Sequence, residues 1–130
     1  MAISKTEKEK NNCEFDVAFS LCHQDFKLAN EICSKLNPSI KKFFYGQNQQ
    51  EIISKSGPEE FSNTFKNRAR LVVILYRKEW SETFYTQLEQ NAILDRTKSG
   101  YDFIFIIQMS EDIGPSWYPV TRIYVRADQF

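Results

Sequence analysis

Residues 71–76 read LVVILY, an apolar run that no charged or strongly polar side chain interrupts. A strand with one face in water alternates apolar and polar residues, so a continuous apolar run predicts a strand covered on both faces. Residues 101–109, YDFIFIIQM, show a similar pattern. Strands buried on both faces are typical of parallel sheets, and the two segments therefore predict the α/β class.

The segments on either side alternate between strand and helix patterns. We expect further strands at residues 14–20, 40–45 and 121–126, and helices at residues 23–36, 58–69 and 79–96. A long polar loop is expected at residues 46–57, and a loop with two prolines and a glycine at residues 110–120. This alternation predicts a parallel sheet with helices on both faces. Ligands of such sheets bind beyond the carboxyl ends of the strands, where the strand order reverses.

The composition limits the kinds of partner. The 130 residues suffice for one domain, expected at residues 14–130 behind a polar arm at residues 1–13. Seventeen basic residues balance seventeen acidic ones, which gives no electrostatic footprint for nucleic acid or for an anionic membrane. The sequence shows no signal peptide and no apolar run of membrane-spanning length, which indicates the cytoplasm. Three cysteines without a CxxC pair predict neither a disulfide framework nor a metal site.

Motifs for common cofactors and catalytic sites are absent. The sequence lacks GxGxxG, GxxxxGK[ST], HExxH and GxSxG, which argues against Rossmann dehydrogenases, P-loop enzymes, zinc proteases and α/β-hydrolases. A phosphoacceptor receiver is disfavoured because the first strand ends in Phe19 and Ser20 rather than in acidic residues. We interpret His23, the single histidine, as a surface or capping residue, since the adjacent Cys22 points away from it.

Glu89 is the carboxylate of interest on the third predicted helix. Tyr85 precedes it by four residues and shares its helix face. The side chains expected to pack on the sheet are Phe84, Leu88, Ala92 and Leu94. Glu89 then lies at the border of the buried stripe, and periodicity alone favours a solvated glutamate.

Aromatic residues gather near the predicted strand ends and around this helix. They are Tyr45, Tyr76, Trp80 and Tyr85. Part of this group is expected to pack in the core. Several aromatic rings around one carboxylate are also able to stack a flat heterocycle and to tune the pKa of that carboxylate.

From residue 14 to residue 126 the sequence resembles the TIR domain family. FDVAFSLCHQD resembles the family's first strand and loop, with matches at Phe15, Asp16, Phe19, Ser20 and Asp25. FFYGQNQQEIISKSG is similar to the second strand and the BB loop, and RARLVVILYRKEW to the third strand. FYTQLEQNAI resembles the bacterial WTxxE signature, with Tyr85 in place of Trp, then Thr86 and Glu89. DIGPSW and RIYVR resemble the family's last loop and strand.

This resemblance implies a three-layer, flavodoxin-like fold with a five-stranded parallel sheet in the order 2-1-3-4-5. The nearest likeness is to prokaryotic TIR domains, many of which are NAD⁺-consuming effectors in antiphage defence. It implies that Glu89 is the catalytic residue of an NAD⁺ glycohydrolase, with NAD⁺ as substrate and no cofactor. The residues expected to line the substrate site are Phe19, Ser20, Tyr45, Tyr76, Trp80 and Tyr85.

The resemblance also implies self-assembly. In the family, the BB loop of one copy completes the site of its neighbour, and here that loop carries Gln47, Gln50, Ile52 and Ile53. The expected partners are other copies of the domain and a fused or associated sensor module. The alternative is a non-catalytic adaptor that acts through TIR–TIR contacts alone, and a site sealed around Glu89 would favour it.

Overall fold

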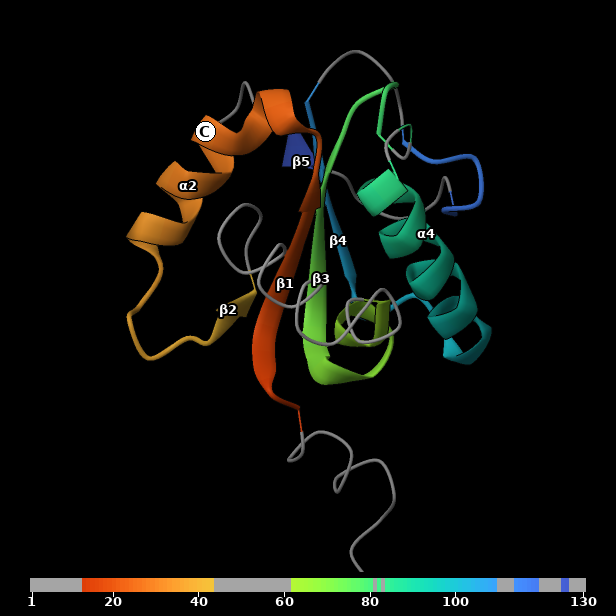
Figure 1. The fold of residues 1–130 in the computed structure, drawn as a ribbon, viewed down its shortest axis with the longest axis horizontal. Coiled ribbons are helices and arrows are strands. Elements are labelled where there is room, and N and C mark those ends of the chain that lie inside the picture. Colours follow the sequence, from red (N-terminus) through yellow and green to blue (C-terminus); the bar gives the residue numbers. More distant parts are fainter. Residues whose placement is uncertain are drawn as a thin grey trace, which may run out of the picture.

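The computed structural model describes residues 13–43, 62–80, 82, 84–109, 114–119 and 125–126. These residues form a parallel sheet seen nearly edge-on, with a helix on each side of it (Figure 1). None of the described helices is long and apolar enough to cross a membrane. The predicted segments at residues 1–12, 44–61, 110–113 and 120–124 lie outside the described residues, and with them the whole of the polar loop expected at residues 46–57.

The sheet contains β1 (Phe15–Leu21), β2 (Lys42–Phe43), β3 (Ala69–Tyr76), β4 (Ile104–Gln108) and β5 (Val125–Arg126). Every pairing is parallel, and the strands lie in the order β2-β1-β3-β4-β5. The two outer strands are short, so β1, β3 and β4 form most of the sheet. The predicted α/β class with a parallel sheet is confirmed. The apolar run of β3 is buried from Val72 to Leu75, as a strand covered on both faces requires.

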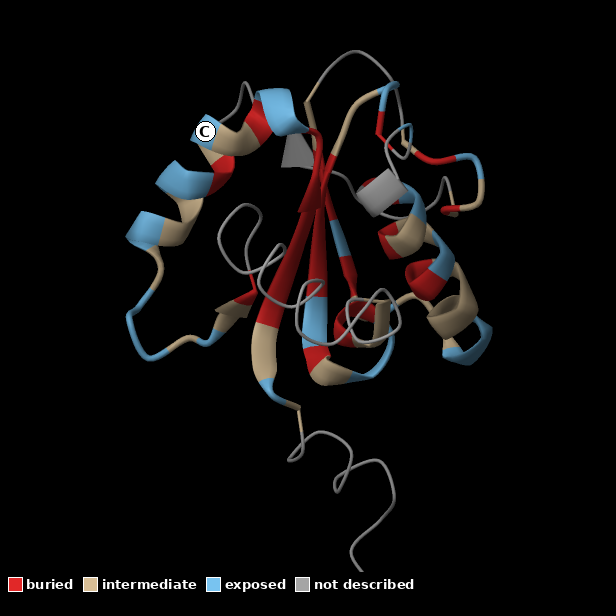
Figure 2. Cartoon of the chain, viewed as in Figure 1, coloured by how far each residue is buried: buried red, intermediate tan, exposed pale blue. Residues whose placement is uncertain are grey.

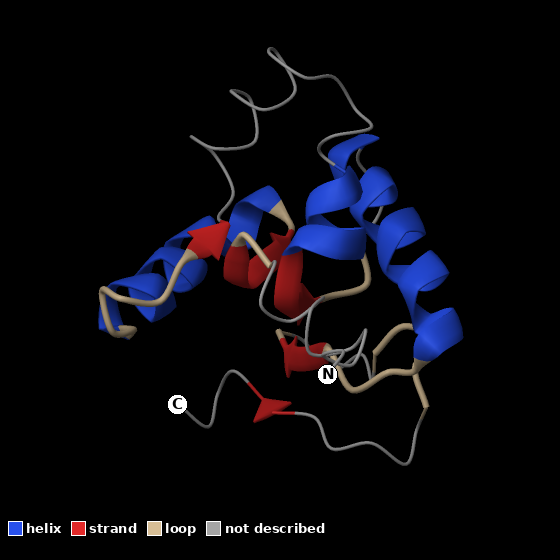
Figure 3. Ribbon diagram, turned by 90° about the horizontal axis from the view of Figure 1, so that it is seen from below, coloured by secondary structure: helices blue, strands red, loops and turns tan. Residues whose placement is uncertain are grey.

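The helices lie on opposite faces of the sheet (Figures 1 and 3). α2 (Phe26–Lys35) follows the 3₁₀ turn η1 (His23–Asp25) and packs on the face that carries Val17, Phe19 and Leu21. α4 (Phe84–Arg96), with the 3₁₀ turn η3 (Thr97–Ser99) at its end, and the π-helix η2 (Thr64–Arg68) lie on the other face. The buried residues follow the strands and the sheet-facing sides of these helices (Figure 2). The core therefore consists of two apolar layers separated by the sheet.

Two predicted helices have different bounds in the structure. The helix expected at residues 58–69 is helical at residues 62–68, but Ala69 already begins β3. The helix expected at residues 79–96 begins at Phe84 instead. Arg77 to Trp80 form a tight turn, in which the Trp80 backbone N–H donates to the Arg77 carbonyl at 2.9 Å. The side chains at both ends of this turn are held by polar partners, described below, and these contacts compete with helix formation.

The buried face of α4 also differs from the prediction. Leu88 is partly buried and packs against the core as predicted, Leu94 is partly buried, and of Phe84 only the backbone is described. The buried positions are the predicted Ala92 together with Thr86, Glu89 and Ile93, which were not predicted. Their spacing of three and four residues is that of one helix face. The interpretation of Glu89 as a solvated glutamate is therefore wrong, because its side chain is 0% exposed.

Candidate active site

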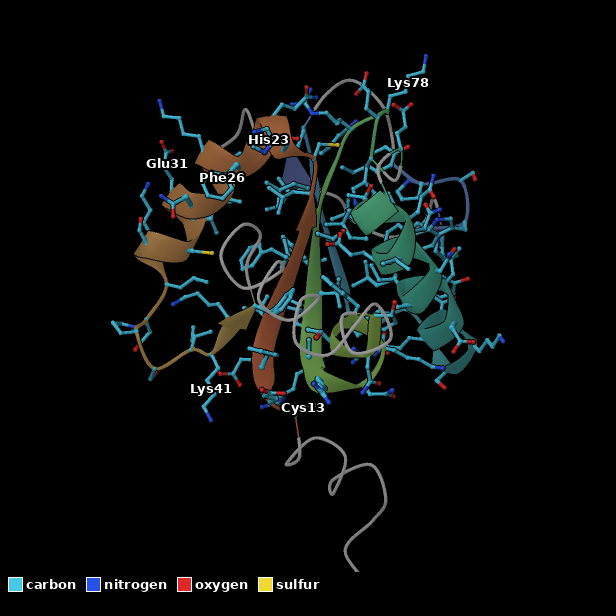
Figure 4. The ribbon with its side chains drawn as sticks, in the orientation of Figure 1. Cys13, His23, Phe26, Glu31, Lys41 and Lys78 are labelled. Atoms are coloured by element: carbon cyan, nitrogen blue, oxygen red, sulfur yellow. The ribbon has the colours of Figure 1, made fainter. Side chains whose placement is uncertain are left out.

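Three of the buried polar residues, Ser20, Asp25 and Glu89, gather where β1 and β3 end. Both strands run in the same direction, so their carboxyl ends meet at one edge of the sheet. The chain continues from β1 to β2 on one side and then to β3 on the other, which makes this edge the point of reversal in strand order. Figure 4 shows His23 and Lys78 at this edge, with Cys13 and Lys41 at the opposite one. Open parallel sheets bind their ligands at such a point.

A chain of hydrogen bonds at this edge joins three buried side chains. The Trp80 indole Nε1–H donates to Ser20 Oγ at 2.9 Å. The Ser20 hydroxyl in turn donates to Glu89 Oε2. An indole nitrogen only donates, so the Ser20 oxygen accepts from Trp80. The Ser20 hydroxyl gives its single hydrogen to Glu89 Oε2.

Aromatic rings enclose the Trp80 end of this chain. The Trp80 ring centroid lies 6.1 Å from that of Tyr76 and 6.3 Å from that of Trp117. Trp117 also donates from its indole N–H to Gln90 Oε1 on α4, at 3.5 Å. Edge-on and tilted contacts at these separations are favourable for aromatic pairs. The rings exclude water from the hydrogen bonds beside them, which strengthens electrostatic interactions there.

An ion pair between buried Asp25 and partly buried Arg77 lies on the same edge. Arg77 donates to both carboxylate oxygens of Asp25, from Nε to Oδ2 at 2.7 Å and from Nη2 to Oδ1 at 2.5 Å. This hydrogen bonding raises the pKa of Arg77. Asp25 stands at the N-terminus of α2 but makes no side-chain capping bond there. The pair thus joins the end of β1 to the turn after β3, in the two-pronged geometry that arginine favours.

Cys22 and His23 do not form a nucleophile–base pair. Cys22 is buried, and burial together with the nearby Asp25 carboxylate raises the pKa of its thiol to about 11. His23 is exposed at the surface, in agreement with its interpretation as a surface histidine. A thiol with a raised pKa is a weak nucleophile at neutral pH. None of the three cysteines forms a disulfide, and the described residues contain no cluster of three or more potential metal ligands.

The structure brings together part of the predicted substrate site. Ser20, Tyr76, Trp80 and Glu89 all lie on the α4 side of the sheet at its carboxyl edge. Phe19 packs in the core on the α2 side, because neighbouring strand residues point to opposite faces. It is therefore not brought to Glu89. The other predicted site residues, Tyr45, Gln47, Gln50, Ile52 and Ile53, lie outside the described residues, and of Tyr85 only the backbone is described.

Four residues of this edge were not among the predicted site residues: Asp25, Arg77, Gln90 and Trp117. One signal for the ion pair was present in the sequence. An acidic residue follows the first predicted strand and a basic residue follows the third, and the ends of adjacent parallel strands meet. Comparison of the sequence with models of known protein families and with curated proteins finds no match.

Proposed function

We propose that this chain is a TIR-type NAD⁺ glycohydrolase that acts after self-assembly, with Glu89 as its catalytic residue. The observation that carries the proposal is the position of the Glu89 carboxylate. It comes from the helix after β3, is buried, and accepts a hydrogen bond from Ser20 at the reversal point of the sheet. The strand order, the segment order along the sequence and the WTxxE-like pattern around Glu89 support the same assignment.

The proposed chemistry uses the charge of the carboxylate. The bond between nicotinamide and its ribose breaks, and nicotinamide leaves with the bonding electrons. Positive charge then develops on the ribose carbon, as it does on the sugar in glycosidases, and a nearby carboxylate stabilises that charge. A water molecule adds to the cation and loses a proton, which gives ADP-ribose. The proposal requires no metal or cofactor.

The burial of Glu89 determines how the site is activated. A carboxylate that is 0% exposed cannot contact NAD⁺, so the site has to open before substrate binds. We propose that contact with a second copy opens and completes it, through the segment that carries Ile52 and Ile53. As in the proteins it resembles, the domain would act in the cytoplasm, in antiphage defence, under the control of a fused or associated sensor module.

The test is release of nicotinamide from NAD⁺ by assembled protein. The full chain is fused to a tetrameric coiled coil, and the wild type is compared with Glu89→Gln. Gln is isosteric and still accepts a hydrogen bond from Ser20, so it removes the charge with little change in packing. We expect the rate to fall at least about 100-fold. The matched control is Glu82→Gln, since Glu82 is an exposed carboxylate close to the start of the same helix. Equal rates for the wild type and Glu89→Gln would remove Glu89 from the mechanism.

The second candidate function is a non-catalytic adaptor, and the full burial of the Glu89 side chain favours it. A buried carboxylate with a hydrogen-bond partner also serves as a structural element of a core. In that case the forced assembly releases no nicotinamide, while untagged copies still associate with one another. The presence or absence of nicotinamide release therefore separates the two functions.

A further inference from the structure

The Ser20 hydroxyl has no hydrogen left to donate to a substrate. Its hydroxyl carries one hydrogen, and the structure uses that hydrogen for Glu89 Oε2. Its oxygen already accepts from the Trp80 indole at 2.9 Å. The residue is also fully buried in β1, where it lies opposite Ile74 of β3 in the sheet. A substrate group would have to break this arrangement in order to bind Ser20.

The two residues before Glu89 in the hydrogen-bond chain are held in place by the sheet and by the turn after β3. Ser20 belongs to a strand paired on both sides, by β2 and by β3. Trp80 ends the turn that Arg77 fixes through its ion pair with Asp25, and its ring contacts Tyr76 and Trp117. Glu89 rises from a helix on one side of the sheet, and its carboxylate reaches the sheet through Ser20. The hydroxyl of Ser20 therefore ties the Glu89 carboxylate to the sheet.

From this geometry we infer that Ser20 and Trp80 are positioning residues for Glu89 and not contacts for the substrate. Trp80 orients the Ser20 hydroxyl by donating to its oxygen, and Ser20 then fixes the direction of the Glu89 carboxylate. The consequence for catalysis rests on the proposed function: a carboxylate held in one orientation is ready to face the ribose carbon. Small misplacements of such groups reduce rates by about 100-fold.

The hydrogen-bond chain has a spectroscopic test that needs no activity. The full chain has two tryptophans, so its ¹⁵N-labelled indoles give two N–H signals, which Trp117→Phe assigns. A hydrogen bond shifts such a signal downfield, and a carboxylate at the end of the chain strengthens each bond in it. We expect the Trp80 signal to move upfield in Glu89→Gln and further upfield in Ser20→Ala. The Trp117 signal should stay in place, and Glu82→Gln should move neither. A Trp80 signal that ignores both Ser20→Ala and Glu89→Gln would overturn the inference.

The kinetic test separates positioning from substrate contact. In the assembled full chain, Ser20→Ala should lower kcat by about 10- to 100-fold and leave KM within about twofold. Trp80→Phe keeps a ring but loses the indole N–H, and should give a smaller fall in kcat. A raised KM with unchanged kcat would restore Ser20 as a substrate contact and overturn the inference. So would a faster rate in the unassembled Ser20→Ala chain, since Ser20 would then hold Glu89 inactive. If the wild type releases no nicotinamide but the indole signals move as expected, the proposed function fails while the positioning of Glu89 stands.

Discussion

At the scale of single residues, the Cys22 thiol gives a pH-dependent prediction. Burial raises its pKa from 9.0 to about 11, and the nearby Asp25 carboxylate adds to this rise. A folded pKa above the unfolded one means that the protonated thiol stabilises the fold fully below pH 9. This contribution is lost as the pH rises from 9 to 11, because the unfolded chain loses the thiol proton first. We therefore expect the free energy of unfolding to fall over this range.

The measurement is urea unfolding at a series of pH values across this range, for the wild type and for Cys22→Ala. Lysines and tyrosines also titrate there, but they do so in both proteins and cancel in the comparison. The decline should be shallower in Cys22→Ala. Parallel curves for the two proteins would contradict the raised pKa of Cys22.

At the scale of elements, the sequence predicted strands more accurately than helix faces. The run from Val72 to Leu75 is apolar throughout, so its burial does not depend on which face each residue occupies. The buried face of α4 includes the polar residues Thr86 and Glu89, and a search for an apolar stripe cannot recognise them. The prediction therefore chose the leucines at 88 and 94, which are partly buried, and of these Leu88 packs against the core. The burial of Glu89 does not follow from periodicity, because it depends on polar partners such as Ser20 on other elements.

The end of α4 supplies a prediction about stability. Arg96 donates to the carbonyls of Phe65, Ala69 and Arg70, at 3.1, 2.6 and 3.2 Å, and its guanidinium carbon lies 4.1 Å from the centre of the Phe103 ring. It thus joins α4 to Phe65 of η2 and to the start of β3. Burial of the guanidinium lowers the pKa of Arg96. The hydrogen bonds to these carbonyls replace the water that the charged group has lost. The planar guanidinium is required to reach several carbonyls at once.

We expect Arg96→Lys to lower the free energy of unfolding by about 2 kcal/mol and Arg96→Ala by somewhat more, because buried carbonyls lose their donors. Urea unfolding measures both values. The matched control is Lys98→Ala, which removes a neighbouring exposed cation whose ion pair with Asp95 is open to solvent and should change stability far less. An effect of Arg96→Ala as small as that of the control would contradict the bridging role of Arg96.

At the scale of the whole molecule, the sequence predicted which edge of the sheet carries the candidate site, but it did not predict the hydrogen bonds within that site. The alternation of elements is enough to bring the ends of β1 and β3 to one edge. The Trp80–Ser20 bond, however, joins residues 60 positions apart, and the Ser20–Glu89 bond joins residues 69 apart. The Trp80–Ser20 bond also depends on the turn from Arg77 to Trp80, which the sequence pattern assigned in part to a helix. Side-chain bonds of this kind follow from the packed geometry of three elements, which no local pattern contains.

Because the Glu89 carboxylate is buried in the single chain, its proposed opening by a second copy is testable on the whole molecule. If a second copy opens and completes the site, the rate of nicotinamide release per chain rises with protein concentration. A higher concentration raises the fraction of chains that are assembled, and only assembled chains bind NAD⁺. The net charge of zero means that the copies do not repel one another at long range. The concentration dependence should therefore change little when salt shortens the screening length from about 30 to about 10 Å. Initial rates over a dilution series of the untagged chain, at two ionic strengths, measure both effects. A rate per chain that stays constant on dilution would mean that each copy opens its own site.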